Sequence, residues 1–144
     1  MNHSPRQLLL RNATLVLPGR TIERGSILIE EGRISSIDEN PVTGAETIDL
    51  GGTTLLPGFI DVHIHGAVGV DVMEATADGL QEVSEFLATQ GVTGWLPTFV
   101  PTVDEDYAIA VDAISQAMRG AGARVLGVHY EGPFVNPEQC GALH

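Results

Sequence analysis

From Leu55 onward, short apolar stretches alternate with amphipathic helical patterns, and this alternation limits the folds open to the chain. Strand, helix, strand, helix, strand favours parallel strands joined by right-handed crossovers. We therefore expect an α/β fold in this part, with Trp95 and Phe99 in its core. The three stretches predicted to be strands, the first of them buried on both faces, lie at 55–65, 92–100 and 124–129.

Each of the two predicted helices has one apolar face, as expected for a helix that packs on a sheet. Thr76 or Asp78 can cap the start of the first helix. The residues on these faces are Leu80, Val83 and Leu87 in the first helix, and Tyr107, Val111, Ile114 and Met118 in the second.

The first part of the chain has strand-like patterns and no helical ones. Two β-branched runs, 26–30 and 33–37, flank Glu31-Gly32, an arrangement typical of a β-hairpin. We expect residues 1–54 to form the N-terminal part of a small β-sandwich domain, built on an antiparallel sheet. Residues 55–144 are then expected to form a second, α/β domain.

Charge and composition exclude several classes of partner. The chain holds 19 Asp+Glu against 7 Lys+Arg, a formal net charge of -12, which opposes sequence-independent attraction to nucleic acid or anionic lipid. No apolar run approaches the ~20 residues of a membrane span, and no stretch resembles a signal peptide. The single cysteine, Cys140, cannot form an internal disulfide. We predict a cytoplasmic protein with no nucleic-acid or membrane partner.

Two histidines separated by one residue end the first predicted strand. Residues i and i+2 of a strand project to the same face, so His63 and His65 can converge on one metal ion while Ile64 packs on the other side. Ligands in (β/α) enzymes cluster at the C-terminal ends of strands, where these histidines lie. The alternative is that both side chains merely face solvent.

A glutamate ends the third predicted strand. Gly132-Pro133 turns the chain away directly after Glu131, which can aim its carboxylate toward the same edge of the sheet as a metal ligand. The alternative is a surface carboxylate at a turn. His129 is expected to be a hydrogen-bonded neighbour of the site rather than a ligand, and Asp61 is expected to be structural.

Two sets of residues carry a family resemblance. Residues 56–66, Leu-Pro-Gly-Phe-Ile-Asp-Val-His-Ile-His-Gly, resemble the signature that opens the barrel in the amidohydrolase superfamily. Residues 91–99 and 127–137, the latter with its Glu-Gly-Pro-Phe run, resemble more specifically the family of N-acetylglucosamine-6-phosphate deacetylases, as does Gly141-Ala142 downstream. The matching motifs extend from about Leu55 to the last residue.

This resemblance implies a fold and a reaction. The fold is the first three strands of a (β/α)8 TIM-type barrel, which takes about 250 residues when complete, so we expect an N-terminal portion only. The reaction, part of amino-sugar catabolism, hydrolyses the acetamide of N-acetylglucosamine 6-phosphate to glucosamine 6-phosphate and acetate. The small phosphorylated amino sugar is the implied partner, and a homodimer is the implied state of the complete protein.

The resemblance also implies a set of site residues. One or two divalent metal ions, zinc, iron or manganese, would be held with Glu131 as a ligand, and His63 and His65 would serve a second ion. Residues after the Glu-Gly-Pro loop contact the sugar in the family, which here points to Ala142 and Leu143. The catalytic aspartate is expected beyond residue 144, so none within this chain is assigned and the chain alone is expected to be inactive.

The sequence leaves two other functions open. A different amidohydrolase, such as a cyclic amidase or a deaminase, would more often carry a carbamylated lysine, and the chain contains no lysine. A non-catalytic metal-binding fragment would need the histidines and the glutamate but no base.

Overall fold

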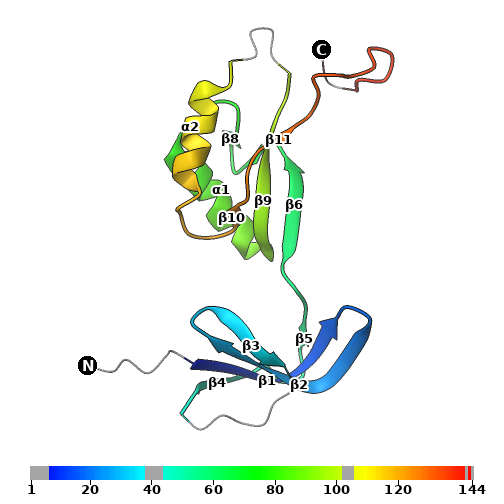
Figure 1. Ribbon diagram of the computed structural model, residues 1–144, viewed down its shortest axis with the longest axis vertical. Coiled ribbons are helices and arrows are strands. Elements are labelled where there is room, and N and C mark those ends of the chain that lie inside the picture. Colours follow the sequence, from blue (N-terminus) through cyan, green and yellow to red (C-terminus); the bar gives the residue numbers. More distant parts are fainter. Residues whose placement is uncertain (1–6, 38–43, 102–105, 142, 144) are drawn as a thin grey trace, which may run out of the picture. The chain divides into compact units, whose positions relative to one another are not determined.

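The computed structural model describes residues 7–37, 44–101, 106–141 and 143 (Figure 1). The chain forms two compact units, Met1–Pro57 and Gly58–His144. The first contains only strands among its described residues, and the second combines strands with two helices.

The N-terminal unit is a five-stranded sheet in the order β3-β2-β1-β4, with β5 also paired to β1. Glu31 and Gly32 form the turn between β2 and β3 with φ values of 50° and 76°. Two positive φ angles are what a tight hairpin turn requires, and the predicted hairpin is confirmed. The strands are β1 Gln7–Leu17, β2 Arg20–Glu30, β3 Arg33–Ile37, β4 Glu46–Asp49 and β5 Thr54–Leu55.

The expectation that this sheet is wholly antiparallel is wrong. β1 pairs antiparallel with β2, but β4 and β5 both pair parallel with β1. β3 and β4 lie at opposite edges of the sheet and run in the same direction, so β4 does not form a hairpin with β3. Local strand patterns predict hairpins between successive strands but give no signal for a parallel partner elsewhere in the sheet.

The C-terminal unit is organised around one strand. β9, Val92–Phe99, pairs parallel with β6, β10 and β11, which gives the α/β arrangement expected from the sequence. The predicted third strand is divided into two short ones that pair with successive parts of β9. The other strands are β6 Phe59–Ile64, β10 Arg124–Val125 and β11 His129–Tyr130, with β7 Gly66–Ala67 and β8 Val70–Asp71 forming a small antiparallel pair.

Helix α1, Ala77–Thr89, packs against β9 (Figure 1). Thr76 is its N-cap, and the Thr76 side chain accepts a hydrogen bond from the Gly79 N–H at 3.2 Å. The predicted apolar face is confirmed, because Leu80, Val83 and Leu87 are all buried, as are Trp95 and Phe99 on β9. These side chains belong to the buried core cluster of the unit.

Helix α2, Ala108–Ala117, lies against α1 with a different face from the predicted one. Of the predicted set Ile114 is buried and Tyr107 is partly buried against the core, whereas Val111 and Met118 are exposed. The distance between packed helices depends on the side chains at their contact, and alanines allow α2 to lie close. The buried residues of α2 are Ala110, Ala113, Ile114 and Ala117.

The prediction that the first strand is buried on both faces is also wrong. Ile60 and Val62 on β6 are 61% and 57% exposed, and Phe59 is exposed as well. Among the described residues β6 pairs only with β9, and of its apolar side chains Ile64 packs against the buried core whereas Ile60 and Val62 do not. An apolar surface therefore remains open on β6. Within the described ranges, no helix is both long and apolar enough to cross a membrane.

Candidate metal centre

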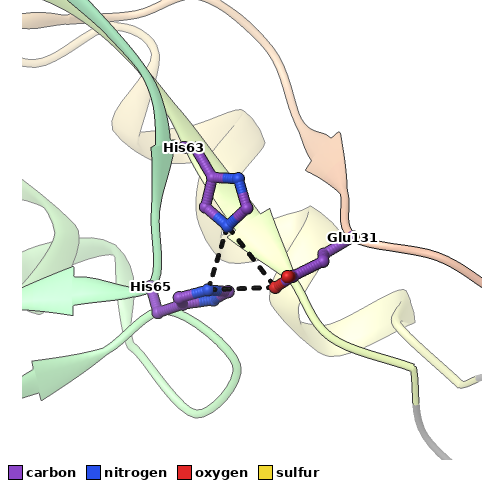
Figure 2. Close-up of side chains that lie close together, drawn as sticks. All are labelled: His63, His65 and Glu131. Carbon is purple, nitrogen blue, oxygen red and sulfur yellow. Dashed lines mark hydrogen bonds and ion pairs between the residues drawn. The ribbon is translucent and has the colours of Figure 1, made fainter. Parts of the chain in front are cut away.

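Three potential ligands meet at one edge of the C-terminal unit (Figure 2). His63 lies near the end of β6, His65 directly follows β6, and Glu131 directly follows β11. β6 and β11 both run parallel to β9, so their carboxyl ends lie at the same edge. Ile64, between the histidines, packs against the buried core and leaves the two imidazoles on the opposite side. The structure thus brings together His63, His65 and Glu131.

The three side chains form a nearly equilateral triangle of ligand atoms. The His63 and His65 Nε2 atoms are 3.2 Å apart, and the Glu131 Oε2 atom lies 3.4 Å from the first and 3.2 Å from the second. A tetrahedral zinc ion with ligands at about 2.0–2.1 Å holds its ligand atoms about 3.3–3.4 Å apart. The cluster therefore has the spacing and the donor types to bind a divalent metal ion.

The cluster is open to solvent. The side chains of His63 and His65 are 45% and 47% exposed, and that of Glu131 is 32% exposed. An ion and a small molecule can both reach this position without rearrangement of the core. Catalytic metal sites keep such an open coordination position, whereas structural sites are closed by protein ligands.

Backbone hydrogen bonds hold the ligands in place. The Glu131 N–H donates to the Phe99 carbonyl oxygen at 2.8 Å, which ties the glutamate to the end of β9. The His63 N–H donates to Asp61 Oδ1 at 3.1 Å, in agreement with the structural role expected for Asp61. The His129 ring lies beside His63, with ring centroids 4.9 Å apart, and its Nδ1 atom is 3.3 Å from Thr98 Oγ1. His129 is thus a hydrogen-bonded neighbour of the cluster.

The two residues predicted to contact a sugar lie after the cluster in the chain. Leu143 is half-buried, and its N–H donates to the Cys140 carbonyl oxygen at 3.2 Å. Ala142 lies outside the described residues. Both remain predictions.

Thr98 was not singled out from the sequence, although it contacts several parts of the cluster. Its hydroxyl accepts from the Ile64 N–H at 3.0 Å, and its carbonyl oxygen lies 3.2 Å from His65 Nδ1. Thr98 is fully buried. A polar residue near the end of a mostly apolar strand was the available signal.

The chain belongs to the amidohydrolase family, because residues 54–142, more than half of its length, match the model described as "Amidohydrolase family". Within that family the proteins it is similar to include deacetylases of phosphorylated amino sugars. It is 40% identical over 138 residues to the N-acetylglucosamine-6-phosphate deacetylase of Mus musculus, an alignment that covers 93% of this chain and 32% of the mouse protein. The resemblance found in the sequence motifs is confirmed.

Two further comparisons support the same placement. The N-acetylgalactosamine-6-phosphate deacetylase of Escherichia coli O157:H7 is 35% identical, over 93% of this chain and 35% of that protein. The crystal structure of N-acetylglucosamine-6-phosphate deacetylase from Pasteurella multocida superposes with a TM-score of 0.85 at 28% identity, over 96% of this chain and 37% of that one. The chain spans about a third of the length of the curated relatives it matches.

Proposed function

We propose that this chain contributes the first metal ligands of an enzyme that hydrolyses the acetamide of N-acetylglucosamine 6-phosphate to glucosamine 6-phosphate and acetate. The observation that carries the proposal is the triangle of His63, His65 and Glu131 at the carboxyl ends of parallel strands. The likeness to deacetylases over 93% of the chain supports the choice of reaction. Residues 55–144 are proposed to form strands one to three of a (β/α)8 barrel, and residues 1–54 part of a small β-sandwich domain.

In the proposed reaction this chain supplies metal ligands and an open side through which the substrate reaches the ion. A divalent ion polarises an amide carbonyl and lowers the pKa of a bound water from about 16 toward 7. His63 and His65 supply neutral nitrogen donors, and the Glu131 carboxylate offsets part of the positive charge. The exposed side of the triangle leaves room for the acetamide group. The proton transfers to and from the leaving amine require a general acid–base group, and the proposal assigns that role to no residue of this chain.

The sugar end of the site is proposed to involve Ala142 and Leu143. The Escherichia coli relative acts, by its name, on N-acetylgalactosamine 6-phosphate, which makes the galactosamine epimer the second candidate substrate. The proposal further includes a cytoplasmic location and a homodimer for the complete protein. Another amidohydrolase activity, or metal binding without catalysis, is the competing function, and the experiments below separate them.

Metal titration tests the proposal most directly. Calorimetric titration with zinc, manganese and ferrous iron should give one ion per wild-type chain. Glu131→Gln, which removes a charged ligand but keeps its size, should lower affinity by at least about tenfold. Glu138→Gln is the matched control, because Glu138 is an exposed carboxylate in the same terminal segment. Wild-type protein that binds no metal, or equal affinity in both variants, would contradict the proposed centre.

Acetate release tests the reaction. The 144-residue chain with added metal is expected to release no acetate from N-acetylglucosamine 6-phosphate or its galactosamine epimer. A longer protein that contains this segment should release acetate from one of them, and Glu131→Gln there should reduce metal content and turnover together. Turnover by the 144-residue chain itself would show that it carries its own general base.

A further inference from the structure

We infer that Thr98 is a positioning residue for the metal centre: it fixes the backbone between His63 and His65, orients His65 as an Nε2 ligand of the ion, and sets which ring nitrogen carries the proton in His129. This inference rests on the proposed function, since it assumes that the imidazole Nε2 atoms bind the ion. It assigns to Thr98 no contact with the substrate.

Thr98 lies where the strands of the site meet. It is fully buried near the end of β9, in register with His129 of β11, and its neighbour Pro97 is in register with Ile64 of β6. The pairing of β6 with β9 shifts register between Asp61 and Ile64. At that irregular point the Ile64 N–H donates to the Thr98 hydroxyl at 3.0 Å. The backbone between the two ligand histidines is therefore held by a side chain of β9.

The Thr98 hydroxyl uses its full hydrogen-bonding capacity. A threonine hydroxyl has one proton to donate and two lone pairs that accept. Its proton is directed to the Leu96 carbonyl oxygen at 3.2 Å, which can only accept. The two lone pairs then accept from the Ile64 N–H and from His129 Nδ1 at 3.3 Å. His129 must therefore carry its proton on Nδ1.

The Thr98 carbonyl oxygen bears on which ring nitrogen of His65 carries the proton. His65 Nδ1 lies 3.2 Å from this oxygen, and a carbonyl oxygen cannot donate. The Glu131 carboxylate, which also only accepts, lies equally close to His65 Nε2 at 3.2 Å. An ion bound at the cluster would take the Nε2 lone pair, and the His65 proton is then on Nδ1, where it is donated to the Thr98 carbonyl. Ligand histidines in metalloproteins commonly donate their other ring N–H to a carbonyl or carboxylate in this way. Thr98 thus orients His65 as an Nε2 ligand of the ion.

Thr98→Val tests the hydroxyl, because valine keeps the shape of threonine and removes both its lone pairs and its proton. We expect zinc affinity to fall by about tenfold or more, with Thr98→Ser retaining most of the wild-type affinity. Ser84→Ala is the matched control. Ser84 is also buried in this unit, and its hydroxyl accepts from Trp95 Nε1 at 3.1 Å, so its loss should leave zinc affinity unchanged.

Nitrogen NMR of the imidazole rings tests the tautomers. At a pH where the rings are neutral, His129 should show the Nδ1–H form without metal and lose this preference in Thr98→Val, and His65 should show the Nδ1–H form with zinc bound. An Nε2–H form for His129 in the metal-free wild type would overturn the inference, even if Thr98→Val does not fold. So would equal zinc affinity in wild type and Thr98→Val. If wild type binds no zinc but His129 carries its proton on Nδ1, the proposed function fails and the tautomer assignment of His129 stands.

Discussion

The two units differ in where they place their polar side chains. In the N-terminal unit, polar contacts such as Arg11 with Asp49, at 3.1 Å, lie on the exposed surface of the sheet. In the described part of the C-terminal unit, two polar residues are buried, and each joins different elements: Ser84 of α1 binds Trp95, and Thr98 binds residues on either strand beside it. Exposed pairs contribute little free energy, whereas buried hydrogen bonds fix one arrangement.

The position of the metal cluster follows from the parallel strands of the C-terminal unit. Parallel strands bring their carboxyl ends to one edge, and the helices that join them cover one face. The ends of β6 and β11 therefore lie close together without disturbing the buried core. The buried Thr98 hydroxyl forms hydrogen bonds with a residue of each strand. The strands of the N-terminal unit bury a small apolar cluster around Ala13, Leu15 and Ile27. Within the described residues, the one candidate metal cluster lies in the C-terminal unit.

The largest expected effect comes from removing a core side chain in one unit at a time. Leu80→Ala in the C-terminal core and Leu15→Ala in the N-terminal core should each cost about 2–5 kcal/mol of unfolding free energy. Trp95, the single tryptophan, reports on the C-terminal unit. Its fluorescence transition should shift in Leu80→Ala and stay constant in Leu15→Ala. Equal shifts in the two variants would show that the units unfold as one.

Metal should stabilise one unit and not the other. Zinc at a hundred times its dissociation constant should raise the unfolding free energy of the C-terminal unit by about 2.7 kcal/mol. The Trp95 transition measures this gain, and hydrogen exchange of β1 and β2 amides should show no change. Addition of a chelator is the control and should reverse the shift. Slower hydrogen exchange of the β1 and β2 amides in the presence of zinc would show that zinc stabilises both units.

A smaller effect is expected from the open apolar surface of β6. Exposed apolar residues on a strand favour association, so the 144-residue chain should scatter light as a mass above its 15.2 kDa. Replacing Ile60 and Val62 together by threonine should bring the mass closer to that of a monomer. Ile34→Thr, at an exposed position of the N-terminal sheet, is the control and should have less effect.

The smallest expected effect concerns acid and the N-terminal unit. A hydrogen bond from the Asn12 side chain, followed by one from the Gly51 N–H, lowers the pKa of Asp49 below its ordinary value. A pKa lowered by folding means stabilisation that is present above about pH 4 and lost as pH falls through the folded-state pKa. Hydrogen exchange in β1 should show this loss, and Asp49→Asn should reduce the pH dependence, leaving the part contributed by Glu30, whose pKa is lowered by the hydrogen bond from Gln7. An unchanged pH response in Asp49→Asn would show that another carboxylate causes the pH dependence.

Sequence patterns predicted the parts of the fold that depend on local periodicity. Leu80, Val83 and Leu87 recur at helical spacing, and the structure buries all three. The spacing of His63 and His65 on a strand predicted that their rings share one face, and the Nε2 atoms do approach to 3.2 Å. The parallel arrangement then accounts for the approach of Glu131, which is distant in sequence.

The structural features that the sequence did not predict depend on contacts between elements far apart in the chain. The buried face of α2 is set by alanines that approach α1, and alanine gives little periodic signal compared with Val111 or Met118. No local motif marks the parallel pairing of β4 with β1. The role of Thr98 depends on three hydrogen bonds to residues on, or directly after, neighbouring strands, so its residue type alone could not reveal it.

The divided third strand has a consequence for motion near the metal cluster. β10 and β11 are each two residues long and pair with β9 separately, at Gly94 and Trp95 and at Thr98 and Phe99. Short ladders of this kind open independently and at lower free energy than the whole domain. Glu131 follows the second ladder, so opening of β11 alone can withdraw the carboxylate while β10 stays docked. The lifetime of a bound ion would then be governed by this local opening, without any unfolding of the helices or of β6.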